Sequence, residues 1–245
     1  MRNIKSFFIL NWPSVHKRGV RGRPSSQQCR QGGEAAQAEH QPSKVGCQHP
    51  SCPAHPPSLH STDFPQITLD PETAHPCLVL SDDYRCVRDG HLRRDVPDTP
   101  MRFNYCVAVL GCQGFSSGKH YWEVEVGNKP SWTLGLVSTS INRKGKISAS
   151  PGNGYWVIRL RNGMELTAKD TPPQRLCPIA FPKRVGVYLD YNAGIASFYD
   201  ASTMVHLYTF SNPRFTGRLF PYFCPGLYNS GENATPLKIC RIPLL

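Results

Sequence analysis

The chain has 245 residues, 39% of them hydrophobic, and its 28 Lys and Arg against 17 Asp and Glu give a formal net charge of +11. This length suits one or two domains, and no apolar run approaches the roughly 18 residues that a membrane-spanning helix needs. The early run at residues 7–10 is also too short for the apolar region of a signal peptide. The sequence therefore excludes a transmembrane protein and argues against secretion.

The ten cysteines are scattered along the chain. A chain of this length can build a core without disulfide bonds, so a disulfide framework is not required. We therefore expect reduced thiols and a cytoplasmic location, with the nucleus as the alternative.

Residues 1–63 are predicted to form a disordered basic arm. They contain eight Lys and Arg, three acidic residues, seven prolines and five histidines, and their few apolar residues follow neither strand nor helix periodicity. The four cations between Lys17 and Arg23 are interpreted as a solvated segment of this arm rather than as an RNA-contacting patch.

A cluster of potential zinc ligands lies in the same arm. Cysteine and histidine are the preferred ligands of zinc, and five of them fall within residues 47–60. Their spacing is not that of a zinc finger, and no apolar residues follow to build the small core that a finger needs. We therefore expect a linker and no metal site.

From Phe64 onward, short alternating segments separated by Gly, Pro, Asn and Asp predict an all-β domain. Strands are expected over residues 120–126, 132–136 and 155–161. The third strand runs into Asn162-Gly163, the preferred pair for a type I′ hairpin turn, so 164–168 should be its return strand.

A second hairpin is predicted farther along the chain. Residues 185–190 and 195–199 flank the turn 191–194, in which Gly194 can supply a positive φ. The segments 138–154 and 209–218 are expected to be long surface loops, which is where a β scaffold usually carries its binding residues.

Three motifs of residues 64–245 resemble the PRY-SPRY domain of tripartite-motif ubiquitin ligases and butyrophilins. They are Leu69-Asp70-Pro71, Trp122-Glu123-Val124-Glu125 and Leu189-Asp190-Tyr191, the last followed by Asn192 where the family usually has Glu. The resemblance divides this region into a PRY part at 64–115 and a SPRY part at 116–245, within one sandwich domain.

The resemblance implies a bent antiparallel β-sandwich, a concanavalin-like jelly roll that binds a protein ligand without cofactor or catalytic machinery. It further implies a role in innate immune signalling and a tripartite-motif homologue as a second partner. Binding to a membrane or to nucleic acid is not expected. Residues 1–63 offer only Cys29, Cys47 and Cys52, too few for the two zinc sites of a RING. This chain is therefore not expected to be an enzyme.

Two alternatives remain open. The chain could act within an E3 ubiquitin ligase, through a longer form or a partner that carries a RING. It could instead sense a small phosphorylated ligand, as some butyrophilins do.

The candidate partner-binding residues lie on one strand face and in nearby segments. Strand alternation places Arg159 and Arg161 on the outward face of the strand at 155–161, where the alternative is a pair of solvated cations. In tripartite-motif relatives the corresponding strand lines a partner-binding groove. The resemblance adds other segments that look like those lining this groove, together with the loops around Arg143 and Arg214. The full set is Thr133, Arg143, Arg159, Arg161, Arg214, Leu227 and Tyr228.

Three other features carry weaker functional interpretations. The basic segment 142–146 is expected to be an ordinary solvated loop rather than a phosphate site. His120 shares a strand face with Trp122 and Val124, so it is interpreted as a core residue rather than as a catalytic one. Asn233-Ala234-Thr235 is a formal glycosylation motif that should be idle in a cytosolic protein.

Overall fold

The computed structural model describes residues 62–211 and 214–242. The predicted disordered arm and the Cys/His tract therefore lie outside the described residues, except for Thr62 and Asp63. Asp63 already belongs to the domain, because its backbone N–H donates to the Lys119 carbonyl at 2.8 Å and its carbonyl accepts from the Tyr121 N–H at 3.0 Å. The folded part thus includes Asp63, directly upstream of Phe64.

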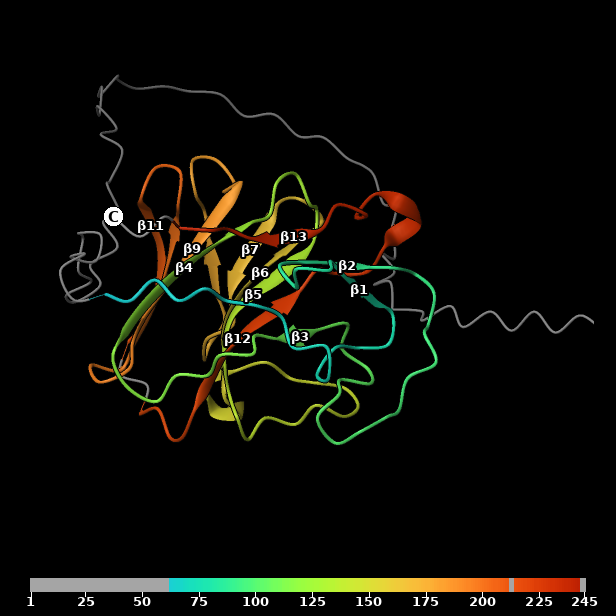
Figure 1. The fold of residues 1–245 in the computed structure, drawn as a ribbon. Coiled ribbons are helices and arrows are strands. Elements are labelled where there is room, and N and C mark those ends of the chain that lie inside the picture. Colours follow the sequence, from blue (N-terminus) through green and yellow to red (C-terminus); the bar gives the residue numbers. More distant parts are fainter. Residues whose placement is uncertain (1–61, 212–213, 243–245) are drawn as a thin grey trace, which may run out of the picture. The chain divides into compact units, whose positions relative to one another are not determined.

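Two antiparallel sheets form the domain (Figure 1). The seven-stranded sheet has the order β1-β2-β13-β4-β9-β10-β11, so strands from the beginning, middle and end of the domain are neighbours. Its strands are β1 (Leu78–Leu80), β2 (Cys86–Asp89), β4 (Lys119–Glu125), β9 (Arg184–Asp190), β10 (Ile195–Asp200), β11 (Val205–Ser211) and β13 (Leu237–Ile239).

The six-stranded sheet has the order β3-β12-β5-β6-β7-β8. Its strands are β3 (Val109–Leu110), β5 (Trp132–Ser138), β6 (Tyr155–Arg161), β7 (Glu165–Ala168), β8 (Gln174–Leu176) and β12 (Leu219–Cys224). Helical structure in the described residues is confined to two single-turn 3-10 helices, Pro151–Asn153 and Asn229–Gly231. Within this part of the chain, no helix has the length and apolar character needed to cross a membrane.

The predicted strands and hairpin turns are confirmed. Strand alternation located β4, β5, β6, β7, β9 and β10 to within two residues at each end. Asn162 and Gly163 both have positive φ, 50° and 69°, as a type I′ turn requires, and Gly194 has a φ of 65° in the β9–β10 turn. The all-β sandwich expected from the sequence is therefore the observed fold.

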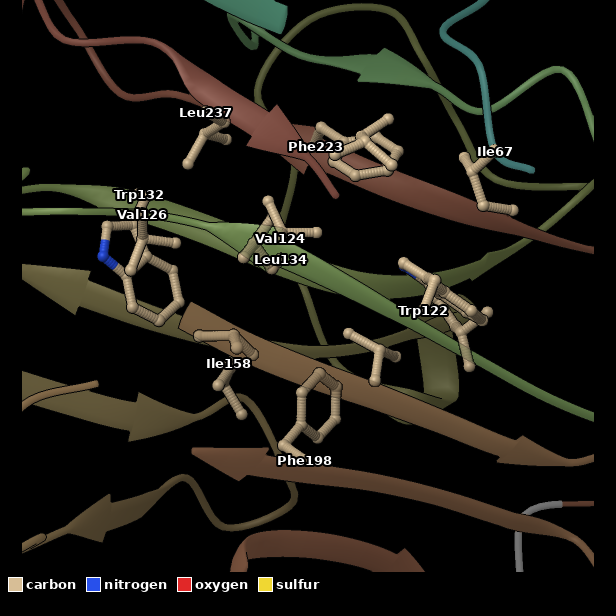
Figure 2. Close-up of a cluster of buried hydrophobic side chains, with 14 of the residues drawn as sticks. Ile67, Trp122, Val124, Val126, Trp132, Leu134, Ile158, Phe198, Phe223 and Leu237 are labelled. Atoms are coloured by element: carbon tan, nitrogen blue, oxygen red, sulfur yellow. The ribbon is translucent and has the colours of Figure 1, made fainter. Parts of the chain in front are cut away.

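The main core lies between the inner faces of the two sheets (Figure 2). Alternate residues of β4 and β6, such as Trp122, Val124 and Ile158, are at most 2% exposed. His120 lies at the margin of this core, where its ring stacks on Phe115 with the centroids 4.1 Å apart. This contact supports its structural interpretation.

A second, smaller core lies on the outer face of the six-stranded sheet. Val137, Tyr155, Val157 and Tyr222 point outward from their strands but are buried, because neighbouring loops cover them. The covering residues include Phe103 and Ile141. Only part of this sheet's outer face is therefore accessible.

The two expected long loops differ from the prediction at their ends. Thr209, Phe210 and Ser211 belong to β11, and Phe210 is only 2% exposed because it packs into the main core. In the other segment, Ser138 belongs to β5 and Ile141 is buried in the second core. The 138–154 segment therefore covers the sheet as well as connecting strands.

Candidate binding surface

A row of polar side chains crosses the uncovered part of the six-stranded sheet. In the cross-strand register, Thr133 of β5 lies opposite Arg159 of β6, and Arg159 lies opposite Thr167 of β7. Thr167 in turn lies opposite Arg175 of β8, and Thr133 lies opposite Cys224 of β12. The strand twist and period place these neighbours on one face. We name Thr133, Arg159, Arg161, Thr167, Lys169 and Arg175 the basic face.

Arg159 lies at the centre of the basic face and is only half-buried. Its Nε is shielded from solvent yet has no hydrogen-bond acceptor among the described residues. Burial lowers the pKa of the guanidinium, and the charge of Arg161 lowers it further. A shielded cationic donor without an acceptor is costly in the free protein, so an incoming carboxylate would relieve that cost.

The charge around Arg159 is mainly positive. Burial lowers the pKa of Lys169, and the charges of Arg159 and Arg161 act in the same direction, which places the three cations close together. Arg161 is exposed and lies opposite Glu165 in the β6–β7 register. Among the described residues, Glu165 therefore faces several cations, and the surface should attract negatively charged groups.

The segment that carries Leu227 and Tyr228 borders the basic face. Leu227 is 66% exposed, whereas Tyr228 is held by its backbone N–H, which donates to Asp89 Oδ2 at 2.9 Å. The Tyr228 ring also contacts His91, with the ring centroids 5.4 Å apart. The exposed Leu227 is therefore adjacent to a residue that is fixed by contacts with the domain.

Asn233 ties this segment to the start of β5. Its buried Nδ2 lies within hydrogen-bonding distance of the carbonyls of Ser131, Pro225 and Leu227, at 3.1, 2.9 and 2.9 Å. The residue is 2% exposed. A glycan cannot be attached to this nitrogen while the domain is folded, so the glycosylation motif serves as a structural anchor.

The structure brings together five of the seven predicted binding residues. Thr133, Arg159 and Arg161 lie on the basic face, and the anchor of Asn233 places Leu227 and Tyr228 beside it. Thr167, Lys169 and Arg175 were missed. Arg175 lies on β8, whose three residues give no clear alternation, and Lys169 follows the end of β7. The period of β7 could have indicated Thr167.

Arg143 and Arg214 lie elsewhere. Arg143 is 7% exposed, and its guanidinium donates to the Met101 carbonyl at 3.0 Å, so it joins two covering loops rather than offering surface to a partner. Burial lowers its pKa. Arg214 is exposed at a separate hollow beside the β9–β10 turn, lined also by Tyr191 and Phe215.

The basic loop 142–146 is also partly committed to internal contacts. Besides Arg143, the ammonium group of Lys144 pairs with the Asp98 carboxylate and the Thr99 carbonyl. Two of the three cations of this loop, Arg143 and Lys144, therefore make contacts within the domain. The geometry therefore favours an ordered covering loop over a dedicated phosphate site.

Comparison with protein-family models finds two adjacent matches. Residues 67–115 match the SPRY-associated domain, PRY, and residues 119–238 match the SPRY domain. Together they extend over almost the whole of the described sandwich.

Several curated proteins are similar over the same region. The chain is 50% identical over 183 residues to brain nuclear factor 7 of Xenopus laevis, covering 74% of this chain and 30% of that protein. It is 53% identical over 174 residues to mouse E3 ubiquitin-protein ligase TRIM69, covering 71% and 34%. Human erythroid membrane-associated protein is 48% identical over 177 residues, covering 72% and 37%. The chain spans about a third of the length of these relatives.

Solved structures share the fold. The crystal structure of the TRIM65 PSpry domain matches with a TM-score of 0.62 at 27% identity, covering 73% of this chain and 91% of that one. Stonustoxin matches with a TM-score of 0.62 at 30% identity, covering 72% of this chain and 29% of the toxin chain.

Proposed function

We propose that this chain, whose residues 67–238 belong to the PRY-SPRY family, is a protein-recognition module that binds its partner through the basic face. The shielded Nε of Arg159 carries the proposal, because this cationic donor has no acceptor among the residues that the structure describes. Strand register, which fixes Thr133 and Arg159 side by side, supplies a rigid platform for it.

The chemistry of the surface points to an acidic partner segment. Arginine binds carboxylates through two parallel hydrogen bonds, so an Asp or Glu side chain fits Arg159 and Arg161 better than a neutral group does. Leu227, which is 66% exposed at the border, offers an apolar contact next to the charged one. We therefore expect an acidic residue with an apolar neighbour in the bound segment.

An affinity pull-down from cell lysate tests this proposal. The bait is the full chain, used as wild type and as the Arg159→Asp/Arg161→Asp variant, and the bound proteins are identified by mass spectrometry. A partner held by the basic face should bind the wild type and be lost with the variant, because the charge reversal repels its carboxylates.

A matched control separates this effect from a general change of charge. Arg88→Asp/Arg241→Asp carries the same charge change on exposed residues of β2 and the segment after β13, in the other sheet. It should retain the partner. All three baits are first matched by thermal melting, and identical protein lists from the three would contradict the assignment of the binding face.

A role in ubiquitin transfer is the wider form of this proposal. Since mouse TRIM69 is named as an E3 ubiquitin-protein ligase, the domain would select the substrate while a RING, on a longer form or on a bound homologue, performs the transfer. A self-ubiquitylation assay of this chain alone and with a RING-bearing homologue distinguishes the two cases. Innate immune signalling remains a prediction from the family resemblance, and a cytoplasmic or nuclear location remains a prediction from the scattered, reduced cysteines.

The alternative function is that the same cations bind a small phosphorylated ligand instead of a protein. Such a ligand should raise the melting temperature of the domain with increasing concentration, since it binds the folded state alone. Inorganic pyrophosphate serves as the probe. A rise that is absent in Arg159→Asp/Arg161→Asp would favour this alternative over a protein ligand.

A further inference from the structure

Two cysteines lie together at the edge of the basic face. Cys224 is the last residue of β12 and lies opposite Thr133 of β5. The preceding residues of β12 pair with β3, Phe223 with Val109, so the chain just before β3 runs alongside Cys224. This path places Cys106 next to Cys224, and both thiols pack against the second core.

The Cys106 sulfur has three polar neighbours. Its Sγ lies 3.2 Å from the Tyr222 hydroxyl, and the Cys224 thiol also hydrogen-bonds to it. Arg159 supplies a positive charge nearby. Hydrogen-bond donors and a cation are the surroundings that stabilise a thiolate.

These contacts divide the two thiols into unequal partners. The hydrogen bond from Cys224 is the main reason that the pKa of Cys106 falls to about 7, with Tyr222 and Arg159 acting in the same direction against burial. The same hydrogen bond, followed by burial, raises the pKa of Cys224. Burial also raises the pKa of Tyr222, which therefore keeps its proton as a donor, and Tyr155 is the other titratable group nearby.

We propose that Cys106 and Cys224 form a peroxide-sensitive dithiol, in which Cys106 is oxidised first and Cys224 resolves it to an intramolecular disulfide. The Cys106 thiolate attacks one oxygen of hydrogen peroxide, the O–O bond breaks, and hydroxide leaves, which yields a sulfenic acid. The Cys224 sulfur then attacks the Cys106 sulfur, an S–S bond forms, the S–O bond breaks, and water leaves with the Cys224 proton. A cellular dithiol reductant reverses the reaction.

The position of the pair links this chemistry to the basic face. Oxidation removes the thiolate that faces Arg159 and joins the segment before β3 to the end of β12, beside Thr133. The dithiol itself does not depend on the proposed function. Only the expected effect of oxidation on partner binding rests on the proposed function.

Peptide mapping of the full chain after oxidation tests the proposal. The reduced protein is treated with increasing hydrogen peroxide, the remaining thiols are alkylated, and the disulfide-linked peptides are identified. The predicted main product joins Cys106 to Cys224 with the loss of two hydrogens and disappears on treatment with dithiothreitol. Linkage of either residue to another cysteine, or no linkage at peroxide levels that oxidise the exposed Cys112, would overturn it.

Two variants define the roles of the cysteines. Cys224→Ser should leave a sulfenic acid on Cys106 that dimedone traps, whereas Cys112→Ser should form the same disulfide as wild type. Alkylation of Cys106 by iodoacetamide should have a midpoint near pH 7, and Arg159→Gln should move that midpoint upward. A midpoint that stays in the range of an ordinary thiol would overturn the assignment of Cys106 as the first to be oxidised.

The last measurement is the binding of the partner that the wild-type bait captures. Its binding to the reduced and oxidised forms is compared, with Cys106→Ser as the variant that cannot be oxidised at this site. Weaker binding of the oxidised wild type would connect the two proposals. Equal binding would contradict only that connection, since the mapped disulfide is read independently.

Discussion

Replacing Gly135 with alanine is expected to lower the free energy of unfolding by about 3 kcal/mol or more. Gly135 lies in the middle of β5 with a φ of 153°, which residues with a side chain rarely adopt. A Cβ at this position would lie 2.2 Å from the Trp156 carbonyl oxygen and 2.8 Å from the Val157 Cα. Both atoms are backbone of β6, so the clash cannot be relieved by a side-chain rotation.

The destabilising substitution lies next to the basic face, because Gly135 is located between Thr133 and Val137 on the outward side of β5. Urea unfolding measures it. Gly127→Ala is the matched control, since Gly127 also has a positive φ, 53°, but nothing lies within 4 Å of its added Cβ. The control should cost about 1 kcal/mol. Equal losses in the two variants would show that β5 and β6 do not approach as closely as described.

Asn233→Ala is the second change with a large expected effect, a loss of about 2–3 kcal/mol. The substitution removes the buried amide that approaches three backbone carbonyls, of Ser131, Pro225 and Leu227, and leaves them without this donor. Unsatisfied buried acceptors cost more than the hydrogen bonds are worth by themselves. The 225–233 segment should also loosen, which would weaken partner binding through Leu227.

Chemical denaturation measures the loss, and Asn153→Ala provides the control. Asn153 is exposed, and its side chain donates one hydrogen bond, to the Ser148 carbonyl at 2.8 Å. Its replacement should cost well under half as much. Similar losses would argue that Asn233 is not an anchor. Partner affinity measured on both variants then shows whether the anchor also positions Leu227.

Sequence periodicity predicted the regular strands well and the irregular ones poorly. Alternation found β4, β5 and β6, because each is long and has one face in the main core. β12 was missed; it carries Pro221 inside the six-stranded sheet, a position where proline is unusual since it cannot donate to the strand ladder. β8 is too short to show a period.

The binding residues were predictable only where strand alternation decides which side of the sheet a side chain faces. Arg159 and Arg161 were placed on the outward face of β6 from the sequence, and the structure has them there. The burial of Arg143 depends on its contact with Met101, more than forty residues away in the chain. The proximity of Cys106 to Cys224 likewise arises from strand pairing between distant segments, which residue spacing does not reveal.

The affinity of a partner recovered by the pull-down tests the central claim most directly. Its dissociation constant is measured by titration calorimetry against the wild type, Arg159→Asp/Arg161→Asp, and the control Arg88→Asp/Arg241→Asp. We expect the first variant to raise the constant at least about 30-fold, equivalent to about 2 kcal/mol, and the control to leave it within about twofold of wild type. Loss of affinity in the control with none in the basic-face variant would place the recognition surface on the other sheet.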